Sequence, residues 1–210
     1  MKSGIIFDFD GVIINSTEIQ RRALMESYKL IVGEGEPSFE EFLSHSGDSL
    51  ENILLKMKLP LDMIEPYRRI SRERIGAVRI YNGMKDLLER LNNQGYKCAL
   101  CTGKDRVRTL ELLERLELID YFETVVCSDD VEKPKPYPDS LILAIDKLCI
   151  SPEDAIIIGD AKNDIICAKS AGVKVIAVTW GDVSRDSLKN ESPDYLVDTV
   201  EELEMIITNQ

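Results

Sequence analysis

"GIIFDFDGVIINS", residues 4–16, joins an apolar stretch to two carboxylates that follow it at once. Ile5, Ile6 and Phe7 are typical of a strand inside a sheet, whereas Asp8 and Asp10 flank the next aromatic residue. A carboxylate at the end of a buried strand loses hydration energy, and only a cation or hydrogen-bond donors lying against it compensate for this loss. The stretch therefore predicts a functional site at the end of the first strand.

The composition limits the possible partners. The chain has 210 residues, 44% of them apolar, which is enough for one domain or a main domain with a small insertion. Its formal net charge of −12 argues against nucleic acid or an anionic membrane as a partner, because both favour basic surfaces. The sequence has neither a long apolar span nor a secretion signal at its N-terminus. We expect a soluble, cytoplasmic protein, monomeric or homodimeric, that does not bind membranes.

Apolar strands alternate with helices from Met84 onward, which predicts a parallel sheet with helices on both faces. The expected strands are 96–101, 124–127, 155–159 and 174–180, with a short extended piece at 195–197, and the expected helices are 84–94, 105–116, 138–148, 163–171 and 199–207. Residues 15–81 carry helical periodicity and no convincing strand. We predict a doubly wound α/β core domain made of residues 1–14 and 82–210, with a helical cap domain of residues 15–81 inserted after the first strand.

Polar residues follow each of the first four predicted strands of this sheet. In an open parallel sheet, ligands bind outside the carboxyl ends of the strands. The residues expected at that edge are Asp8 to Gly11, Thr102 to Lys104, the segment "SDDVEKPKPYPD" at 128–139, and "GDAKND" at 159–164. Several carboxylates, a hydroxyl, glycine-bearing turns and a lysine would therefore meet at one place.

The carboxylates in this set need a cation. Asp8, Asp10, Asp160 and Asp164 would bring four negative charges into one cleft, and close like charges raise carboxylate pKa values. All-oxygen ligands suit a hard ion such as Mg²⁺, which also binds phosphate oxygens. Lys133 or Lys135 would add positive charge, and Thr102 with nearby backbone N–H groups offers hydrogen bonds to a phosphate.

In these motifs and in their order, the chain resembles the haloacid dehalogenase superfamily, in its phosphatase branch with a helical cap. The Asp-x-Asp-Gly motif is matched by residues 8–11, the Thr-Gly motif by Thr102-Gly103, and the acidic motif by Gly159, Asp160 and Asp164. The family's lysine precedes a Pro-rich stretch and is matched by Lys133 in "KPKPYPD", although Lys135 has a similar setting.

The resemblance implies a role for each matched residue. Asp8 would attack phosphorus and form an aspartyl-phosphate, and Asp10 would protonate the leaving oxygen and then activate water. Thr102 and Lys133 would bind phosphoryl oxygens, with Gly11 and Gly103 also at the phosphate. Asp160 would ligate Mg²⁺ directly, together with Asp8, the backbone carbonyl of Asp10, and Asp164 as a ligand or an anchor.

The cap segment around Gly47 faces the cleft in this family, so His45, Ser46 and Gly47 are candidate substrate-specificity residues by analogy. His45 is the only histidine of the chain. A cap arginine, Arg22 or Arg72, is a candidate to reach a second anionic group of the substrate.

The function that this resemblance implies is Mg²⁺-dependent hydrolysis of a small phosphate monoester, as in phosphoglycolate phosphatases, with a small phosphorylated metabolite as substrate. Two alternatives stay open. One is a phosphosugar mutase of the β-phosphoglucomutase type, although the helix "STEIQRRALMESY" lacks the histidine of that branch and offers Gln20 instead. The other is a phosphate-sensing regulator without turnover, which the loss of a nucleophile or of a metal-binding acid would have favoured.

Overall fold

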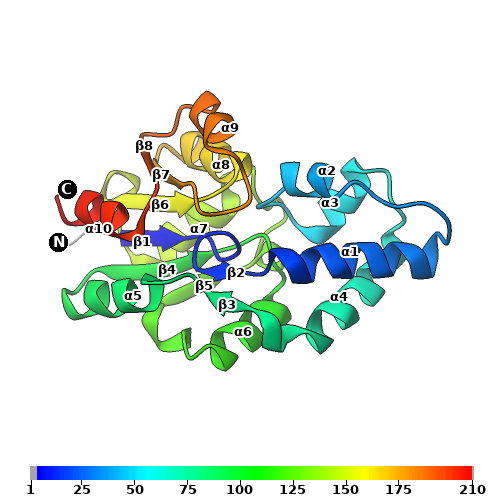
Figure 1. The fold of residues 1–210 in the computed structure, drawn as a ribbon. Helices are drawn as coiled ribbons and strands as arrows, with labels where there is room; N and C mark the ends of the chain where they lie inside the picture. The colour runs from blue at the N-terminus through cyan, green and yellow to red at the C-terminus, as the bar shows by residue number, and fades with distance from the viewer. Residues whose placement is uncertain (1–3, 210) are drawn as a thin grey trace.

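The computed structural model describes residues 4–209, which form a six-stranded parallel sheet with helices on both faces and a group of helices at one end (Figure 1). The strands of this sheet are β1 (Gly4–Phe7), β4 (Lys97–Cys101), β5 (Thr124–Val126), β6 (Ala155–Gly159), β7 (Lys174–Val178) and β8 (Tyr195–Val197). Their order is β5-β4-β1-β6-β7-β8. The α/β fold predicted from the sequence is confirmed.

Residue alternation along the strands explains why both faces of the sheet are covered. Ile5 and Phe7 point into one apolar cluster and Ile6 into another, as period-two side chains must. The first cluster includes α5 (Met84–Asn93), α6 (Arg106–Arg115) and α10 (Val200–Thr208). The second includes α7 (Asp139–Leu148), α8 (Lys162–Ala171) and α9 (Arg185–Asn190).

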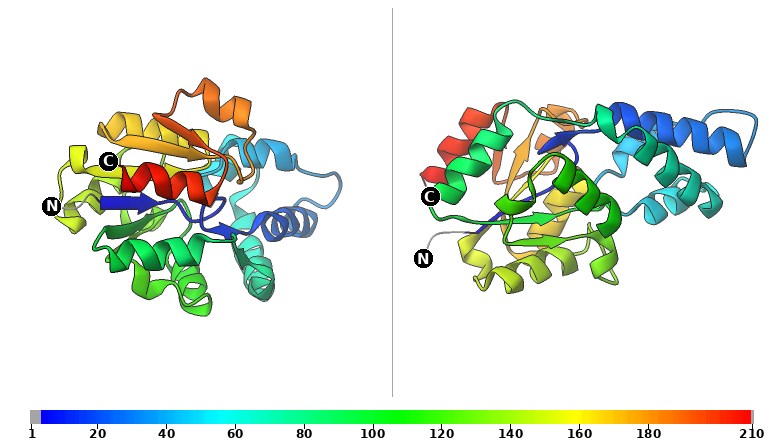
Figure 2. Two further views of the ribbon diagram at one scale, coloured as in Figure 1. Left: turned by 60° about the vertical axis from the view of Figure 1, so that its left-hand side comes forward. Right: turned by 90° about the horizontal axis from the view of Figure 1, so that it is seen from below.

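A second group of helices lies beyond the carboxyl ends of the strands, at the opposite end of the molecule from both labelled termini (Figures 1 and 2). It comprises α1 (Thr17–Ile31), α2 (Phe39–Ser44), α3 (Leu50–Lys56) and α4 (Ile64–Glu73), which we call the cap. These helices pack around an apolar cluster of their own that includes Leu24, Phe42 and Leu54. The domain boundaries at residues 15 and 81 stay a prediction.

Some elements were absent from the prediction because they are too short to show a period. The strands β2 (Ile14–Asn15) and β3 (Arg79–Ile80) pair antiparallel where the chain enters and leaves the cap. The helices α2 and α9 have six residues each. Short 3-10 helices occupy Leu61–Met63, Ile75–Ala77, Ile119–Tyr121, Ser128–Asp130 and Pro152–Asp154. Over residues 4–209, no helix combines the length and apolar character that crossing a membrane requires.

Strand β1 is the point where the topology reverses. The chain runs from β1 to β4 and β5 on one side, then to β6, β7 and β8 on the other. Phe7 pairs with Leu100 of β4 and Ile158 of β6, so the residues that follow these three strands lie side by side. A crevice for ligands is expected at such a switch point.

Candidate active site

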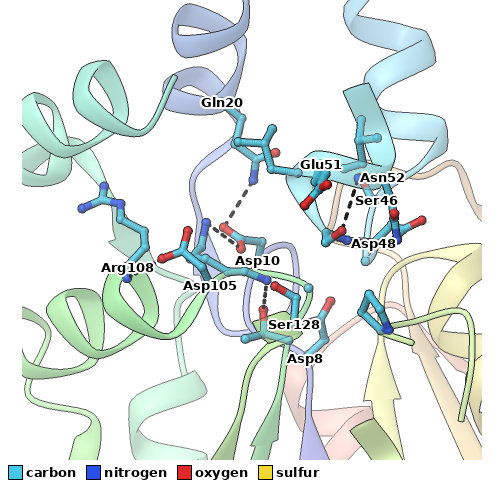
Figure 3. Close-up of a pocket in the computed structure, with 18 of the residues that line it drawn as sticks. Asp8, Asp10, Gln20, Ser46, Asp48, Glu51, Asn52, Asp105, Arg108 and Ser128 are labelled. Carbon is cyan, nitrogen blue, oxygen red and sulfur yellow. Dashed lines mark hydrogen bonds and ion pairs between the residues drawn. The ribbon is translucent and has the colours of Figure 1, made fainter. Parts of the chain in front are cut away.

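A cavity of about 400 Å³ lies between the carboxyl ends of β1, β4 and β6 and the cap (Figure 3). Asp8 and Asp10 rise from its floor, Gln20 reaches in from α1, and Ser46, Asp48, Glu51 and Asn52 come from the loop and helix opposite. Other lining residues predicted from the sequence are Gly11, Gly47, Thr102, Gly103 and Asp160. The strand-end motifs therefore converge on one cavity.

Asp8 and Asp164 share a buried lysine. The Nζ atom of Lys135 lies 3.0 Å from Asp8 Oδ1, donates to Asp164 Oδ1 at 2.6 Å, and donates to the carbonyl of Cys101 at 3.1 Å. The Lys135 side chain is 1% exposed. A buried ammonium is tolerated only when it is paired, and here two carboxylates and a carbonyl meet it.

Lys135, and not Lys133, lies against Asp8. The sequence pattern assigned this position to Lys133, so the structure corrects that prediction. Lys133 is exposed, and its Nζ atom lies over the ring of Tyr137, 5.6 Å from the ring centroid. Both lysines precede a proline in an irregular segment, so neighbouring sequence alone does not distinguish them. The two lysines are distinguished by the packing of that segment, which brings Lys135 against Cys101 and Asp164.

The buried carboxylates of Asp8, Asp160 and Asp164 form an acidic triad, whose ligand atoms all lie within 4.8 Å of one another. Glycines permit this packing: a Cβ atom at Gly11 or Gly181 would lie 2.0 or 2.2 Å from the Asp160 carboxylate. Asp164 also accepts a hydrogen bond from the N–H of Ala161 at 3.2 Å, so it caps α8 as well as facing Lys135.

Burial and like charge make the triad costly in its ionised form. Burial raises the pKa of Asp8 to about 7, with the Lys135 ammonium acting in the opposite direction and Asp164 adding to the rise. Burial also raises the pKa of Asp160, and the charges of Asp164 and Asp8 add to it. Burial alone would lower the pKa of Lys135, but the carboxylates of Asp164 and Asp8 outweigh it and hold that pKa above the usual range. The triad is thus a site short of positive charge.

Asp10 is not a member of the triad, and its carboxylate is held by donors from the start of α1 and from the loop after β4. Its carboxylate accepts a short hydrogen bond from Ser16 and one from Gln20 Nε2 at 3.2 Å, and it lies 3.1 Å from Lys104 Nζ. Ser16 precedes α1 and Gln20 lies in its first turns, so the start of the cap orients this carboxylate. Asp10 is therefore placed by both the cap and the loop after β4.

Thr102 is buried directly after β4, and its backbone N–H donates to Val126 O at 3.0 Å. Its hydroxyl accepts a hydrogen bond from the N–H of Lys104 at 3.2 Å. The next residue, Gly103, touches the cap: a Cβ atom there would lie 2.4 Å from Gly47 O and 2.5 Å from Asp48 O. Glycine is required at position 103 because the backbone of the cap loop leaves no room for a side chain.

We expect Gly103→Ala to lower kcat/KM by at least about tenfold, because the new methyl group would push the loop at Gly47 away from the cavity. Gly76→Ala is the matched control, since its methyl group would meet only the flexible end of Arg115, at 3.3 Å. Steady-state kinetics on a phosphate ester measures both variants. Wild-type kcat/KM in Gly103→Ala would mean that this contact does not shape the active conformation.

The other cap residues singled out in the sequence have different surroundings. Ser46 and Gly47 line the cavity, whereas His45 is not among its lining residues. The side-chain amide of Asn163 donates to the carbonyls of His45 at 3.1 Å and Ser46 at 2.8 Å, which ties this loop to α8. Arg22 and Arg72 do not line the cavity and pair instead with Glu18 and Glu111.

Sequence reasoning missed several groups around the site because their contacts depend on how loops and helices fold against one another. They are Ser16 as a donor to Asp10, Asn163 as the anchor of the cap loop, Arg108 of α6, which donates to Ser71 O at 2.8 Å, and Asp182, which accepts from Thr17 at 2.7 Å. The only available signal was position, since Ser16 and Asn163 lie inside the motifs themselves.

Comparison with known proteins shows the family to which this chain is related. Residues 5–178 match the family model described as haloacid dehalogenase-like hydrolase. The chain is 32% identical over 209 residues to pyrophosphatase PpaX of Bacillus pumilus, which covers 97% of this chain and 95% of that protein.

Two solved structures have the same fold. A structure described as a predicted phosphatase from Clostridium acetobutylicum has a TM-score of 0.88 and 26% identity over 100% of both chains. Another, described as a predicted phosphoglycolate phosphatase from Haemophilus somnus, has a TM-score of 0.82 over 98% of this chain and 97% of that one. At 22% identity, this second likeness shows the fold alone.

Proposed function

We propose that this chain, which belongs to the haloacid dehalogenase-like hydrolases and is a phosphatase, uses Mg²⁺ and a phosphorylated Asp8 to release phosphate from a small phosphorylated metabolite. The observation that carries the proposal is the buried triad of Asp8, Asp160 and Asp164, of which Asp8 and Asp160 line the cavity and Asp8 and Asp164 contact the buried Lys135. The name of the pyrophosphatase relative makes pyrophosphate one of the substrates to test.

The residues of the triad suit a divalent cation. All three triad members are carboxylates, and hard oxygen donors of this kind favour Mg²⁺ over softer metals. With a pKa of about 7, Asp8 would be partly protonated near neutral pH and so a weak nucleophile. Mg²⁺ bound by Asp8, Asp160 and Asp164 would supply positive charge that favours ionised Asp8 and neutralises phosphoryl oxygens.

The proposed reaction has two displacements. An oxygen of Asp8 bonds to phosphorus while the bond from phosphorus to the leaving oxygen breaks. The electron pair of that bond stays on the leaving oxygen, which accepts a proton from Asp10. Water then attacks phosphorus after giving a proton back to Asp10, which frees Asp8 and releases phosphate. Lys135 neutralises charge on Asp8, and the hydroxyl of Thr102 offers a hydrogen bond to a phosphoryl oxygen.

The contacts of Asp10 favour hydrolysis over a mutase reaction. Gln20, the residue that the first cap helix offers in the absence of the mutase branch's histidine, donates to Asp10 at 3.2 Å, and an amide does not relay a proton as a histidine does. Hydrolysis needs only a water molecule ordered by Asp10. We therefore expect one inorganic phosphate released for each phosphate monoester consumed, and two for each pyrophosphate, without conversion of β-glucose 1-phosphate to glucose 6-phosphate.

We expect EDTA to abolish phosphate release and added Mg²⁺ to restore it, because the triad lacks sufficient positive charge without a metal. A colorimetric phosphate assay over a panel of phosphorylated metabolites, pyrophosphate included, measures both the substrate range and this dependence. Activity that survives exhaustive chelation would contradict the proposed role of the triad.

A further inference from the structure

Lys104 lies next to Asp10, but the proposed reaction assigns it no role. It follows Thr102 and Gly103 at the end of β4, lines the cavity, and its Nζ atom lies 3.1 Å from Asp10 Oδ2. Its side chain is 17% exposed. A lysine that is mostly removed from solvent and set against the proposed proton donor is close to the position of the leaving group.

The ammonium of Lys104 has spare hydrogen-bonding capacity. An ammonium carries three N–H donors, and within residues 4–209 the carboxylate of Asp10 is the one partner found for this nitrogen. Lys135 provides the contrast, because Asp8, Asp164 and the carbonyl of Cys101 surround its nitrogen. Lys104 is therefore able to bind a further acceptor that enters the cavity.

The other cations that line the cavity in the described part of the chain are Arg68 and Arg108, and both already have acceptors among neighbouring residues. Arg68 pairs with Asp105 at 3.2 Å, and Arg108 donates to Ser71 O at 2.8 Å and to Glu111 at 3.2 Å, while the buried Nε of Arg108 has no partner among the described residues. The contacts with Asp105 and Ser71 join α4 to the start of α6. Arg22 and Arg72, the arginines singled out in the sequence for a second anionic group, do not line the cavity.

Charge development in the first displacement gives Lys104 a function. When the bond to phosphorus breaks, its electron pair moves to the leaving oxygen beside Asp10. A leaving group that already carries a phosphate or a carboxylate concentrates negative charge there, and a fixed cation stabilises it far more than it stabilises a neutral alcohol.

We propose that Lys104 is a specificity-determining residue that binds an anionic leaving group, so that the preferred substrates carry a second phosphate or a carboxylate beyond the scissile bond. This inference rests on the proposed function and adds the class of leaving group. Pyrophosphate represents the first kind of substrate, phosphoglycolate the second, and glycerol phosphate a neutral leaving group.

The test is the selectivity ratio, defined as kcat/KM for the better of the two anionic substrates divided by kcat/KM for glycerol phosphate. We expect Lys104→Gln to lower this ratio by at least about tenfold and Lys104→Arg, which keeps the charge, to retain most of it. A loss of proton donation by a disturbed Asp10 would fall most heavily on glycerol phosphate, whose alkoxide leaving group needs the proton most, and would raise the ratio instead of lowering it. Lys85→Gln, which removes a lysine paired with Glu117 outside the cavity, is the matched control and should leave the ratio unchanged.

The outcomes separate this inference from the proposed function. An unchanged ratio in Lys104→Gln, or a wild-type enzyme that prefers glycerol phosphate, would overturn the role of Lys104 while leaving the phosphatase proposal standing. Absence of Mg²⁺-dependent phosphate release from a broad panel of phosphorylated metabolites would overturn both. The relative loss on pyrophosphate and on phosphoglycolate identifies which anion Lys104 binds.

Discussion

Asp8→Asn is expected to lower kcat for phosphate release by at least about a thousandfold, because the amide does not form the phosphorylated intermediate. The fold should persist, since the substitution removes one of several crowded negative charges and keeps the size of the side chain. Measurements of kcat together with thermal unfolding test both parts. Rapid acid quench followed by mass spectrometry should detect a phosphorylated wild-type enzyme and no such adduct in the variant.

Asp120→Asn is the control for this experiment. Asp120 is exposed and does not line the cavity, so its replacement should leave kcat and thermal stability close to wild type. An Asp8→Asn variant that keeps more than about a tenth of wild-type activity would remove Asp8 from the role of nucleophile.

Lys135→Met is expected to have the other large effect, on both activity and stability. The change leaves Asp8 and Asp164 without their shared cation in a buried site, and breaking such a pair costs about 3–5 kcal/mol. We also expect kcat to fall by at least about a hundredfold, because charge on the phosphoryl oxygens would lose a neighbouring ammonium. Thermal denaturation and steady-state kinetics measure the two effects separately.

Lys133→Met is the matched control, since this lysine lies two positions away in the same segment and is exposed. It should keep kcat within about threefold of wild type and leave the melting temperature almost unchanged. The sequence pattern by itself predicts the opposite order of damage. Equal losses in the two variants would mean that the contacts of Lys135 do not persist in the working enzyme.

The sequence by itself determined the sheet and the edge at which the site lies. Buried strands show continuous apolar runs, and polar residues begin where each strand ends, so the sequence alone assigns Asp8, Thr102 and Asp160 to one edge of the sheet. This succeeded because parallel strands in register bring their ends together whatever the helices between them do. The motifs were also sufficient to predict a phosphatase.

Only the tertiary structure decided which side chains contact one another at that edge of the sheet. The choice between Lys133 and Lys135 depends on how an irregular segment packs on Asp164, and irregular segments have no period from which the direction of a side chain follows. The partners of Asp10 likewise come from the start of α1 and the loop after β4, which are far apart in sequence. Strand periodicity is a local property of the chain, whereas the direction of a loop side chain is set by the distant groups that neutralise it.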